Sequence, residues 1–449
     1  MIRPDPTAAA LFVSAPASGQ GKTTLVAGLA RHASRLGMRV RVFKAGADFI
    51  DPTILERASG RPVYQLDLWM GGLTDCRRLL RAAAEDADLI LVEGVMGLHD
   101  GEPSSAELAR LLGIPVVVVI DANAMAQTFG AVVLGLRDYR PEVPFHGVLA
   151  NRVGGAAHAS MLAASLSALP RPPSFLGAVP DDPALVMPER HLGLVEAAEI
   201  AHLDYLIDRA ADALAAARPF DGLPVIRFPA EPAARAAPAS RAEPPDPPRA
   251  PPRLLDGARI AVARDEALSF IYPANLDVLR ELGATTLFFS PLRDERLPEA
   301  EAVYLPGGYP ELHAERLAAN RSLHEALRAH SRAGKPLLAE CGGMMLLFER
   351  LIDVRGRAHS MVGLLPGETA MQPRLQALAL QSVTFDQGEL RGHSFHHSRL
   401  ATPLEPAARG RTQHGAEGEA VFRLGRLTAS YVHFYWPSNP RALAGLLAP

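Results

Sequence analysis

The most constraining feature of this sequence is a repeated alternation of short apolar runs with longer amphipathic segments. Before residue 229, apolar runs that end in polar residues occupy 9–14, 40–43, 89–93, 115–121 and 147–151, and segments with helical spacing occupy 23–36, 76–85 and 126–137. Apolar strands that alternate with helices predict a parallel sheet covered by helices on both faces. Ligands of such folds bind at the carboxyl ends of the strands, where the polar residues of this sequence lie.

A second alternation of the same kind follows a proline-rich interruption. Nine prolines fall between Pro229 and Pro252, in a stretch without a periodic apolar face, which predicts a semi-extended linker. Beyond it, strands are expected at 259–263, 285–289, 302–305 and 336–339, with a helix at 273–282. We therefore predict an α/β protein with domains at 1–228 and 256–449, joined by a linker at 229–255.

Composition narrows the class of protein. The formal net charge of -3 gives no reason to expect nucleic acid or an anionic membrane surface as a partner. The sequence has two cysteines, Cys76 and Cys341, which argues against a disulfide framework and fits a reducing compartment. No segment approaches the roughly 18 apolar residues of a membrane span, and the apolar start leads into a glycine-rich motif as a first strand. We expect a cytoplasmic protein. Composition does not decide whether it forms a homodimer.

The glycine-rich motif is SGQGKTT at 18–24, between an expected strand and an expected helix. Its glycines let backbone N–H groups turn toward phosphate oxygens, and the helix N-terminus adds partial positive charge. Lys22 would reach the outer phosphates and the Thr23 hydroxyl would hold Mg²⁺. Pro16 stands where the first glycine of this motif usually lies, and the alternative is a chance glycine turn. The candidate nucleotide-binding residues are Gly19, Gly21, Lys22, Thr23 and Thr24.

Four carboxylates follow the next two strands. They lie in the segments FKAGADFIDP (43–52) and VEGVMGLHDG (92–101). One such residue alone is usually a loop cap or a solvated charge, but four beside a phosphate loop favour a metal-dependent phosphoryl-transfer site. The candidate metal ligands are Thr23, Asp48 and Glu93, and the candidate catalytic carboxylates are Asp48, Asp51 and Asp100.

Two further segments of the first domain remain open between function and structure. Asn151 ends the fifth expected strand, where its amide suits an adenine edge and a turn equally well. The segment PERHLGL (188–194) places Arg190 and His191 together. They can clamp the carboxylates of a polyacid, or the segment is an ordinary surface loop.

The second domain carries a candidate thiol nucleophile. In LAECGGM (338–344), Cys341 lies between a strand and a helix, a turn that exposes the thiol and whose helix N-terminus is expected to lower the thiol pKa. The N–H of Gly342 can donate to a developing oxyanion, and Gly308 in YLPGGYP (304–310) can supply a second donor.

A base is expected at His433, in SYVHFYW (430–436), although a lone histidine there is also a core residue by default. The cluster GHSFHH (392–397) suggests a metal site only weakly, because its three histidines have no Cys or carboxylate at ligand spacing. Cys76 lies in a helical stretch without a visible partner and is expected to be inert.

Taken in order, these motifs resemble the cobyrinic acid and hydrogenobyrinic acid a,c-diamide synthases of cobalamin biosynthesis. The resemblance covers the whole chain apart from the linker. The motifs that carry it are SGQGKTT, FKAGADFIDP, QLDLWM, VEGVMGLHDG, NRVGG, PERHLGL, VARDEALSFIYPANLD, LPGGYPEL, AECGGMMLL and SYVHFYW.

The resemblance implies a dethiobiotin-synthetase-like P-loop domain with a doubly wound sheet, followed by a class I glutamine amidotransferase domain. It implies ATP, Mg²⁺, glutamine and a corrinoid or tetrapyrrole polycarboxylate as ligands. Cys341 would be the glutaminase nucleophile and His433 its base, and Phe49, Ile50, Arg190 and His191 would face the tetrapyrrole. Two residues depart from the family pattern: Ser394 replaces a Glu, and Tyr435 stands where triad enzymes carry the orienting acid, which leaves a Cys–His pair.

The expected reaction is amidation of the a and c side-chain carboxylates through an acyl phosphate and ammonia from glutamine. Amidation of another polyacid, such as other corrinoid side chains or a nickel tetrapyrrole precursor, is an alternative. A P-loop switch with a partner-binding second domain is another, but the AECGG thiol argues against it. The sequence does not decide between a cobalt-containing and a metal-free macrocycle.

Overall fold

The computed structural model describes residues 5–190, 193–217, 219–220, 222–229 and 253–449. The chain forms two compact units, one of Met1–Leu68 and Gly72–Glu243, and one of Trp69–Gly71 and Pro244–Pro449. Most of the expected linker lies outside the described residues, so its bounds stay a prediction. Within the described part of the chain, no helix is long and apolar enough to cross a membrane.

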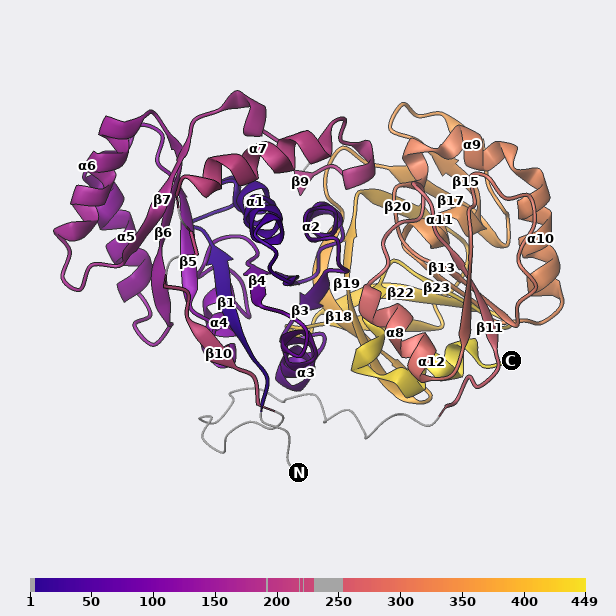
Figure 1. Ribbon diagram of the computed structural model, residues 1–449. Coiled ribbons are helices and arrows are strands. Elements are labelled where there is room, and N and C mark those ends of the chain that lie inside the picture. Colours follow the sequence, from indigo (N-terminus) through magenta and orange to yellow (C-terminus); the bar gives the residue numbers. More distant parts are fainter. Residues whose placement is uncertain (1–4, 191–192, 218, 221, 230–252) are drawn as a thin grey trace. The chain divides into compact units, whose positions relative to one another are not determined.

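The first unit is built on a mostly parallel sheet (Figure 1). Its strands are β1 (Thr7–Ser14), β2 (Val40–Ala45), β3 (Tyr64–Leu66), β4 (Leu89–Glu93), β5 (Val116–Asp121), β6 (Phe145–Val153), β7 (Ser174–Pro180) and β10 (Val225–Arg227). The order is β3-β2-β4-β1-β5-β6-β7, all parallel, and β10 pairs with β1 antiparallel. The strand order reverses beside β1, and this is where ligands of such sheets bind.

Helices cover both faces of this sheet. They are α1 (Lys22–Arg35), α2 (Asp51–Ser59), α3 (Gly72–Ala84), α4 (Ser105–Leu112), α5 (Thr128–Asp138), α6 (Ala156–Ser167) and α7 (Leu203–Ala215). Strand β8 (Glu189–Arg190) pairs antiparallel with β9 (Gly193–Leu194). Alternate residues of β1 enter different cores: Phe12 packs with α3 to α6, and Leu11 with α1, α2 and α7. This two-sided burial explains why the strands are apolar throughout, and it confirms the predicted α/β class.

The second unit contains a mixed sheet. Its strands are β11 (Arg259–Ala263), β12 (Thr285–Phe289), β13 (Ala302–Leu305), β14 (Leu337–Glu340), β18 (Ala377–Phe385), β19 (Gly388–His396), β21 (Ala408–Thr412), β22 (Glu417–Leu424), β23 (Leu427–Ser430) and β24 (His433–Phe434). The order is β12-β11-β13-β14-β23-β22-β21-β18-β19-β24. Pairing is parallel from β12 to β23 and antiparallel from β23 to β24.

The antiparallel part of this sheet must curl back on itself. β23 and β24 are separated by five inter-strand steps along the ladder, which would span about 24 Å in a flat sheet. However, Ser430 at the end of β23 and His433 at the start of β24 are three residues apart, a reach of at most about 10 Å. The curl therefore returns β24 to the carboxyl end of the parallel strands.

Helices and a smaller sheet complete the second unit. The helices are α8 (Pro273–Glu281), α9 (Ala314–Ala319), α10 (Arg321–Arg332), α11 (Gly342–Leu347) and α12 (Pro440–Leu447). The smaller sheet has the order β16-β15-β17-β20, formed by β15 (Phe348–Ile352), β16 (Ala358–Ser360), β17 (Leu365–Met371) and β20 (Ser398–Ala401). Apolar side chains of α9, α10 and α11 pack in one core of the unit, and those of α8 and α12 in the other.

Candidate active sites

The loop between β1 and α1 has the conformation expected of a phosphate loop. Gly21 caps α1 with φ 85°, a left-handed backbone that favours glycine. A Cβ atom at this position would also lie 2.4 Å from Asn151 Nδ2, so the loop and β6 approach too closely for any side chain. Lys22 Nζ donates to the carbonyl oxygens of Ala17 at 3.2 Å and Met96 at 2.7 Å, which holds the ammonium group over the loop.

A buried lysine contacts the carboxylates at the carboxyl ends of the strands. Lys44, at the end of β2, has Nζ 2.5 Å from Asp51 Oδ2, 2.8 Å from Glu93 Oε1 and 3.6 Å from Asp48 Oδ2. Burial opposes ionisation of this lysine, but the charges of Asp51 and Glu93 outweigh it and raise the Lys44 pKa. Sequence reasoning missed Lys44 as a site residue, although its place at a strand end, directly before the carboxylates, was a usable signal.

The two aspartates beside Lys44 are in different states. Asp48 Oδ1 accepts hydrogen bonds from the backbone amides of Ile50 at 2.8 Å and Asp51 at 3.1 Å. Burial, with the charge of Asp51 adding to it, raises the pKa of Asp48 to about 7. Burial also opposes ionisation of Asp51, but the charge and hydrogen bond of Lys44 lower the Asp51 pKa. One carboxyl is thus poised near neutral pH and its neighbour is ionised.

The donor set beside the phosphate loop fits Mg²⁺. Thr23 Oγ1 donates to Glu93 Oε1 at 2.8 Å. Glu93 is fully buried, and its second oxygen, Oε2, has no hydrogen-bond partner among the residues described. In that same part of the chain no three His, Cys, Asp or Glu side chains surround a metal position. One hydroxyl and one carboxylate suit Mg²⁺, which binds mainly through nucleotide phosphates and water.

Asn151 and Asp100 position loops around this site. Asn151 Nδ2 donates to the carbonyl oxygen of Gln20 at 3.0 Å, and Gln20 Oε1 accepts from the Asp121 amide at 2.9 Å. Asn151 therefore ties the phosphate loop to the end of β6, and its contact with an adenine edge stays a prediction. Asp100 is exposed, and its Oδ2 accepts from the Gly97 amide at 3.0 Å.

The four residues expected to face a tetrapyrrole are only partly described. Phe49 and Ile50 are half-buried in the turn between β2 and α2, next to Asp48 and Asp51. The backbone of Arg190 lies in β8, and His191 lies outside the described residues. Their contact with a substrate stays a prediction.

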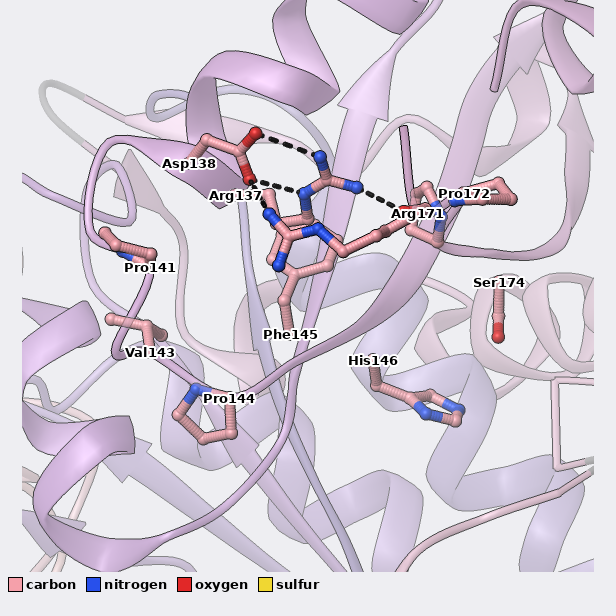
Figure 2. A pocket seen from close by; sticks show the side chains of 11 residues that line it. Arg137, Asp138, Pro141, Val143, Pro144, Phe145, His146, Arg171, Pro172 and Ser174 are labelled. Atoms are coloured by element: carbon pink, nitrogen blue, oxygen red, sulfur yellow. Dashed lines mark hydrogen bonds and ion pairs between the residues drawn. The ribbon is translucent and has the colours of Figure 1, made fainter. Parts of the chain in front are cut away.

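A hollow of about 400 Å³ lies at the amino ends of the parallel strands, by the start of β6 and β7 (Figure 2). Arg137 and Arg171 are its charged lining, with Asp138. Arg137 Nε donates to Asp138 Oδ1 at 2.6 Å, and a second Arg137 nitrogen donates to the Arg171 carbonyl. Ligands of such sheets bind at the carboxyl ends of the strands, and the guanidinium of Arg137 is already paired with Asp138 and the Arg171 carbonyl. The hollow is therefore not the nucleotide site.

In the second unit, Cys341 occupies a strained turn between β14 and α11. Its φ of 43° and ψ of -108° are unusual for a residue with a side chain. The Cys341 amide donates to the carbonyl of Ser430 at 2.7 Å, which fixes the turn against β23. This strand–turn–helix geometry is that of a nucleophile elbow.

Paired glycines bring the expected oxyanion donors and the expected base together. A Cβ on Gly342 would lie 3.0 Å from Gly308 N, so the two predicted donor amides are neighbours. A Cβ on Gly307 would lie 2.1 Å from Cε1 of His433. The segment after β13 therefore contacts both the residue that follows Cys341 and the imidazole of His433.

Both members of the Cys–His pair are buried in their neutral forms. Cys341 is 4% exposed, and burial, with the charge of Glu311 adding to it, raises the pKa of its thiol. The Gly342 amide lowers that pKa but is outweighed, so the expectation of a thiol pKa lowered by the helix N-terminus is wrong. Burial, helped by His393 and His396, keeps the pKa of His433 well below its usual value. His433 is thus available to accept a proton.

His396, in the GHSFHH segment, has structural partners. His396 Nδ1 contacts the Ser398 carbonyl at 2.9 Å and its Nε2 contacts Glu419 Oε1 at 3.1 Å. Its ring stacks on Tyr431 with a centroid distance of 3.7 Å. Ser394, the departure from the family pattern, accepts a 2.7 Å hydrogen bond from Gln381 Nε2.

A phosphate loop at the strand ends of one α/β unit and a cysteine elbow in a second define a nucleotide-dependent enzyme with an amidotransferase-type domain. Family models agree with this division. Residues 11–195 match the CobQ/CobB/MinD/ParA nucleotide binding domain. Residues 259–440 match the CobB/CobQ-like glutamine amidotransferase domain.

Similar proteins span both domains. A hydrogenobyrinate a,c-diamide synthase of Stutzerimonas stutzeri is 56% identical over 441 residues, covering 98% of each chain. One of Pseudomonas aeruginosa is 56% identical over 442 residues, covering 98% of this chain and 97% of the relative. A cobyrinate a,c-diamide synthase of Herminiimonas arsenicoxydans is 49% identical over 452 residues, covering 100% and 99%. The chain belongs to the a,c-diamide synthase family, and it is a glutamine-hydrolysing ligase by its domains.

Proposed function

We propose that this enzyme uses ATP and glutamine to amidate the a and c side-chain carboxylates of hydrogenobyrinate or cobyrinate. The observation that carries the proposal is that one chain holds both half-sites: a phosphate loop beside Lys44 and its carboxylates, and a buried cysteine elbow next to the paired glycines that contact His433. Sequence identity of 56% over 98% of the chain to two proteins named for hydrogenobyrinate makes the metal-free macrocycle the first substrate to test.

The first unit activates the carboxylate. A carboxylate oxygen attacks the γ-phosphorus of ATP, the bond from that phosphorus to the β-phosphate oxygen breaks, and ADP leaves an acyl phosphate. Lys22 exchanges its carbonyl partners for phosphate oxygens, and the loop amides bind the β-phosphate. Thr23 and Glu93 would hold Mg²⁺, which neutralises phosphate charge when bound. Lys44 offsets the charges of Asp51 and Glu93 so that an anionic substrate can approach.

The second unit releases ammonia from glutamine. The Cys341 thiol transfers its proton to His433 as its sulfur attacks the side-chain amide carbon, and the Gly308 and Gly342 amides stabilise the oxyanion. His433 returns the proton to the leaving nitrogen, which departs as ammonia and leaves a thioester. Water, deprotonated by His433, hydrolyses the thioester to glutamate and regenerates the thiol.

Ammonia then attacks the acyl phosphate carbon, phosphate leaves, and the nitrogen loses a proton. We assign that proton to Asp48, because a carboxyl with a pKa of about 7 is half ionised near neutral pH. The sequence of steps runs twice to give the diamide. We place it in the cytoplasm, since the free cysteines Cys76 and Cys341 suit a reducing compartment.

Mass spectrometry on the reaction products tests the proposal. Purified full-length protein is incubated with ATP, Mg²⁺ and glutamine, and hydrogenobyrinate and cobyrinate are offered in parallel. Two carboxylate-to-amide conversions that require ATP support the proposal, and the relative rates identify the preferred macrocycle. ATP hydrolysis without amidation of either macrocycle would contradict it and point to another polyacid.

A further inference from the structure

The position of the base raises the question of what holds its imidazole. His433 lies in the two-residue strand β24, and the residue two places later is Tyr435 rather than an acid. Strand β24 pairs antiparallel with β19, and the register places His393 directly opposite His433. The histidine cluster that had no role in the sequence analysis therefore borders the base.

His393 makes two specific contacts in this place. Its ring stacks on that of His433 with centroids 5.0 Å apart and an angle of 19° between the planes. Its Nδ1 shares a 2.9 Å hydrogen bond with Tyr272 Oη. Tyr272 in turn packs edge-on against Tyr435, with centroids 5.4 Å apart. The hydrogen bond fixes the rotation of the His393 ring, and the stack passes that orientation to His433.

The backbone around the stack is built for close approach. A Cβ on Gly392 would lie 2.0 Å from the His433 carbonyl oxygen, so β19 reaches β24 only because residue 392 is glycine. Gly307 likewise leaves no room for a side chain beside the His433 ring. Phe270 completes the surroundings with its ring centroid 6.0 Å from that of His433.

The chemistry of a stacked neutral imidazole suits a general base. To take the proton of Cys341, His433 must present one ring nitrogen to the thiol, and a ring stacked on its face limits how far the imidazole can tilt. Burial lowers the pKa of His393 to about 3, so this ring stays neutral at working pH. His396 also influences His433, and its Nε2 is engaged with Glu419.

We propose that His393, held by Tyr272, is a positioning residue that orients the imidazole of His433, the orienting role that an acid fills in triad amidotransferases. The inference rests on the proposed glutaminase function of Cys341 and His433. It assigns a task to the GHSFHH segment that requires no metal ion.

The test compares glutamine-dependent and ammonia-dependent amidation in full-length variants. His393→Ala should lower the kcat of glutamine hydrolysis about 100-fold, with KM for glutamine within about threefold of wild type. Amidation with ammonium chloride should stay within about twofold. His393→Phe keeps the aromatic stack without the hydrogen bond and should recover part of the loss, and Tyr272→Phe should lose about tenfold. His330→Phe, a buried histidine bonded to the Pro336 carbonyl, is the matched control and should leave kcat unchanged.

Each result decides the matter. A kcat within threefold of wild type for both His393→Ala and His393→Phe would overturn the inference. An equal loss with ammonium chloride would also overturn it, because the role of His393 would then be structural. Should His393→Ala be insoluble, His393→Phe and Tyr272→Phe carry the comparison. The proposed function fails separately, when Cys341→Ala retains glutaminase activity.

Discussion

Three ionisable side chains at the two sites, of which Lys44 and Glu340 are buried and Asp48 is half-buried, have their protonation set by their neighbours rather than by solvent. Lys44 stays charged because Asp51 and Glu93 contact its ammonium. Asp48 titrates near neutral pH, since burial opposes its ionisation. Glu340, directly before the nucleophile, has a pKa raised to about 8 by burial, although Tyr304 Oη donates to its Oε2 at 2.8 Å. Two of these lead to pH-dependent predictions.

Asp48→Asn should remove a limb of the pH–rate profile. If Asp48 accepts a proton during amide formation, it acts only when ionised, so the wild-type rate rises about tenfold per pH unit below about 7 and levels off above it. Asparagine cannot accept the proton, so the variant should be slower above pH 7 and nearly independent of pH. Initial rates with saturating ammonia between pH 5.5 and about 9 measure this, because ammonia bypasses Cys341. An unchanged limb in Asp48→Asn would assign the proton transfer to another group.

Glu340→Gln should stabilise the enzyme increasingly as pH rises. The folded pKa of Glu340 is about 8 and its unfolded value is 4.5, so between these values the unfolded chain ionises while the folded chain retains the proton. Wild-type stability therefore falls as pH rises through this window, by on the order of 1 kcal/mol per pH unit from this group. Glutamine mimics the protonated form. Urea unfolding at pH 5 and pH 8 should show a gap between variant and wild type that widens with pH, and a constant gap would refute the assignment.

At the scale of elements, the pairing of β19 with β24 depends on one glycine. In Gly392→Ala the added Cβ would meet the His433 carbonyl at 2.0 Å, and neither backbone can move within its ladder without breaking hydrogen bonds. We expect a loss of glutaminase kcat of at least tenfold while ammonia-dependent amidation continues. Gly135→Ala, in helix α5 with open space around it and without a left-handed backbone, is a control for substitution at a glycine. Equal glutaminase activity in the two variants would show that the close approach is dispensable.

The parallel strands and their helices could be predicted because their residues are apolar on both faces. The expected strand at 89–93 is β4, that at 259–263 is β11, and the helix at 273–282 is α8 with one residue fewer. Strands β15 to β22 were not predicted. Leu424, for example, is exposed on β22, whose opposite face carries Glu419 and Arg423, so the alternation that identifies a half-buried strand is blurred.

The site residues that could be predicted lie in local motifs, and those that were missed depend on contacts between distant segments. Lys22, Thr23 and Cys341 lie in motifs whose residues act together within seven positions, so the sequence alone indicates them. His393 and Tyr272 meet their partners only through the ladder of β19 with β24 and through a hydrogen bond across 121 positions. No pattern within a local window encodes such a contact.

At the scale of the whole molecule, the two units should be separable by nitrogen source. Cys341→Ala should abolish amidation with glutamine and keep amidation with ammonium salts, whereas Lys22→Ala should abolish both, because each nitrogen source needs the acyl phosphate. Cys76→Ala, a buried cysteine of α3, and Lys335→Ala, bonded to the Ala300 carbonyl, are the matched controls. Product analysis with each source gives the answer. Loss of ammonia-dependent activity in Cys341→Ala would contradict the division of labour.

Burial of the Cys341 thiol has a consequence for the chemical durability of the enzyme. Oxidation by peroxide begins with an exposed thiolate, and its later products, the sulfinic and sulfonic acids, are largely irreversible. Cys341 is 4% exposed and its thiol pKa is raised, so the resting enzyme offers an oxidant neither access nor charge. The sulfur becomes reactive only when a proton acceptor and an electrophile are both in place, and the nucleophile is preserved between turnovers without a protecting disulfide.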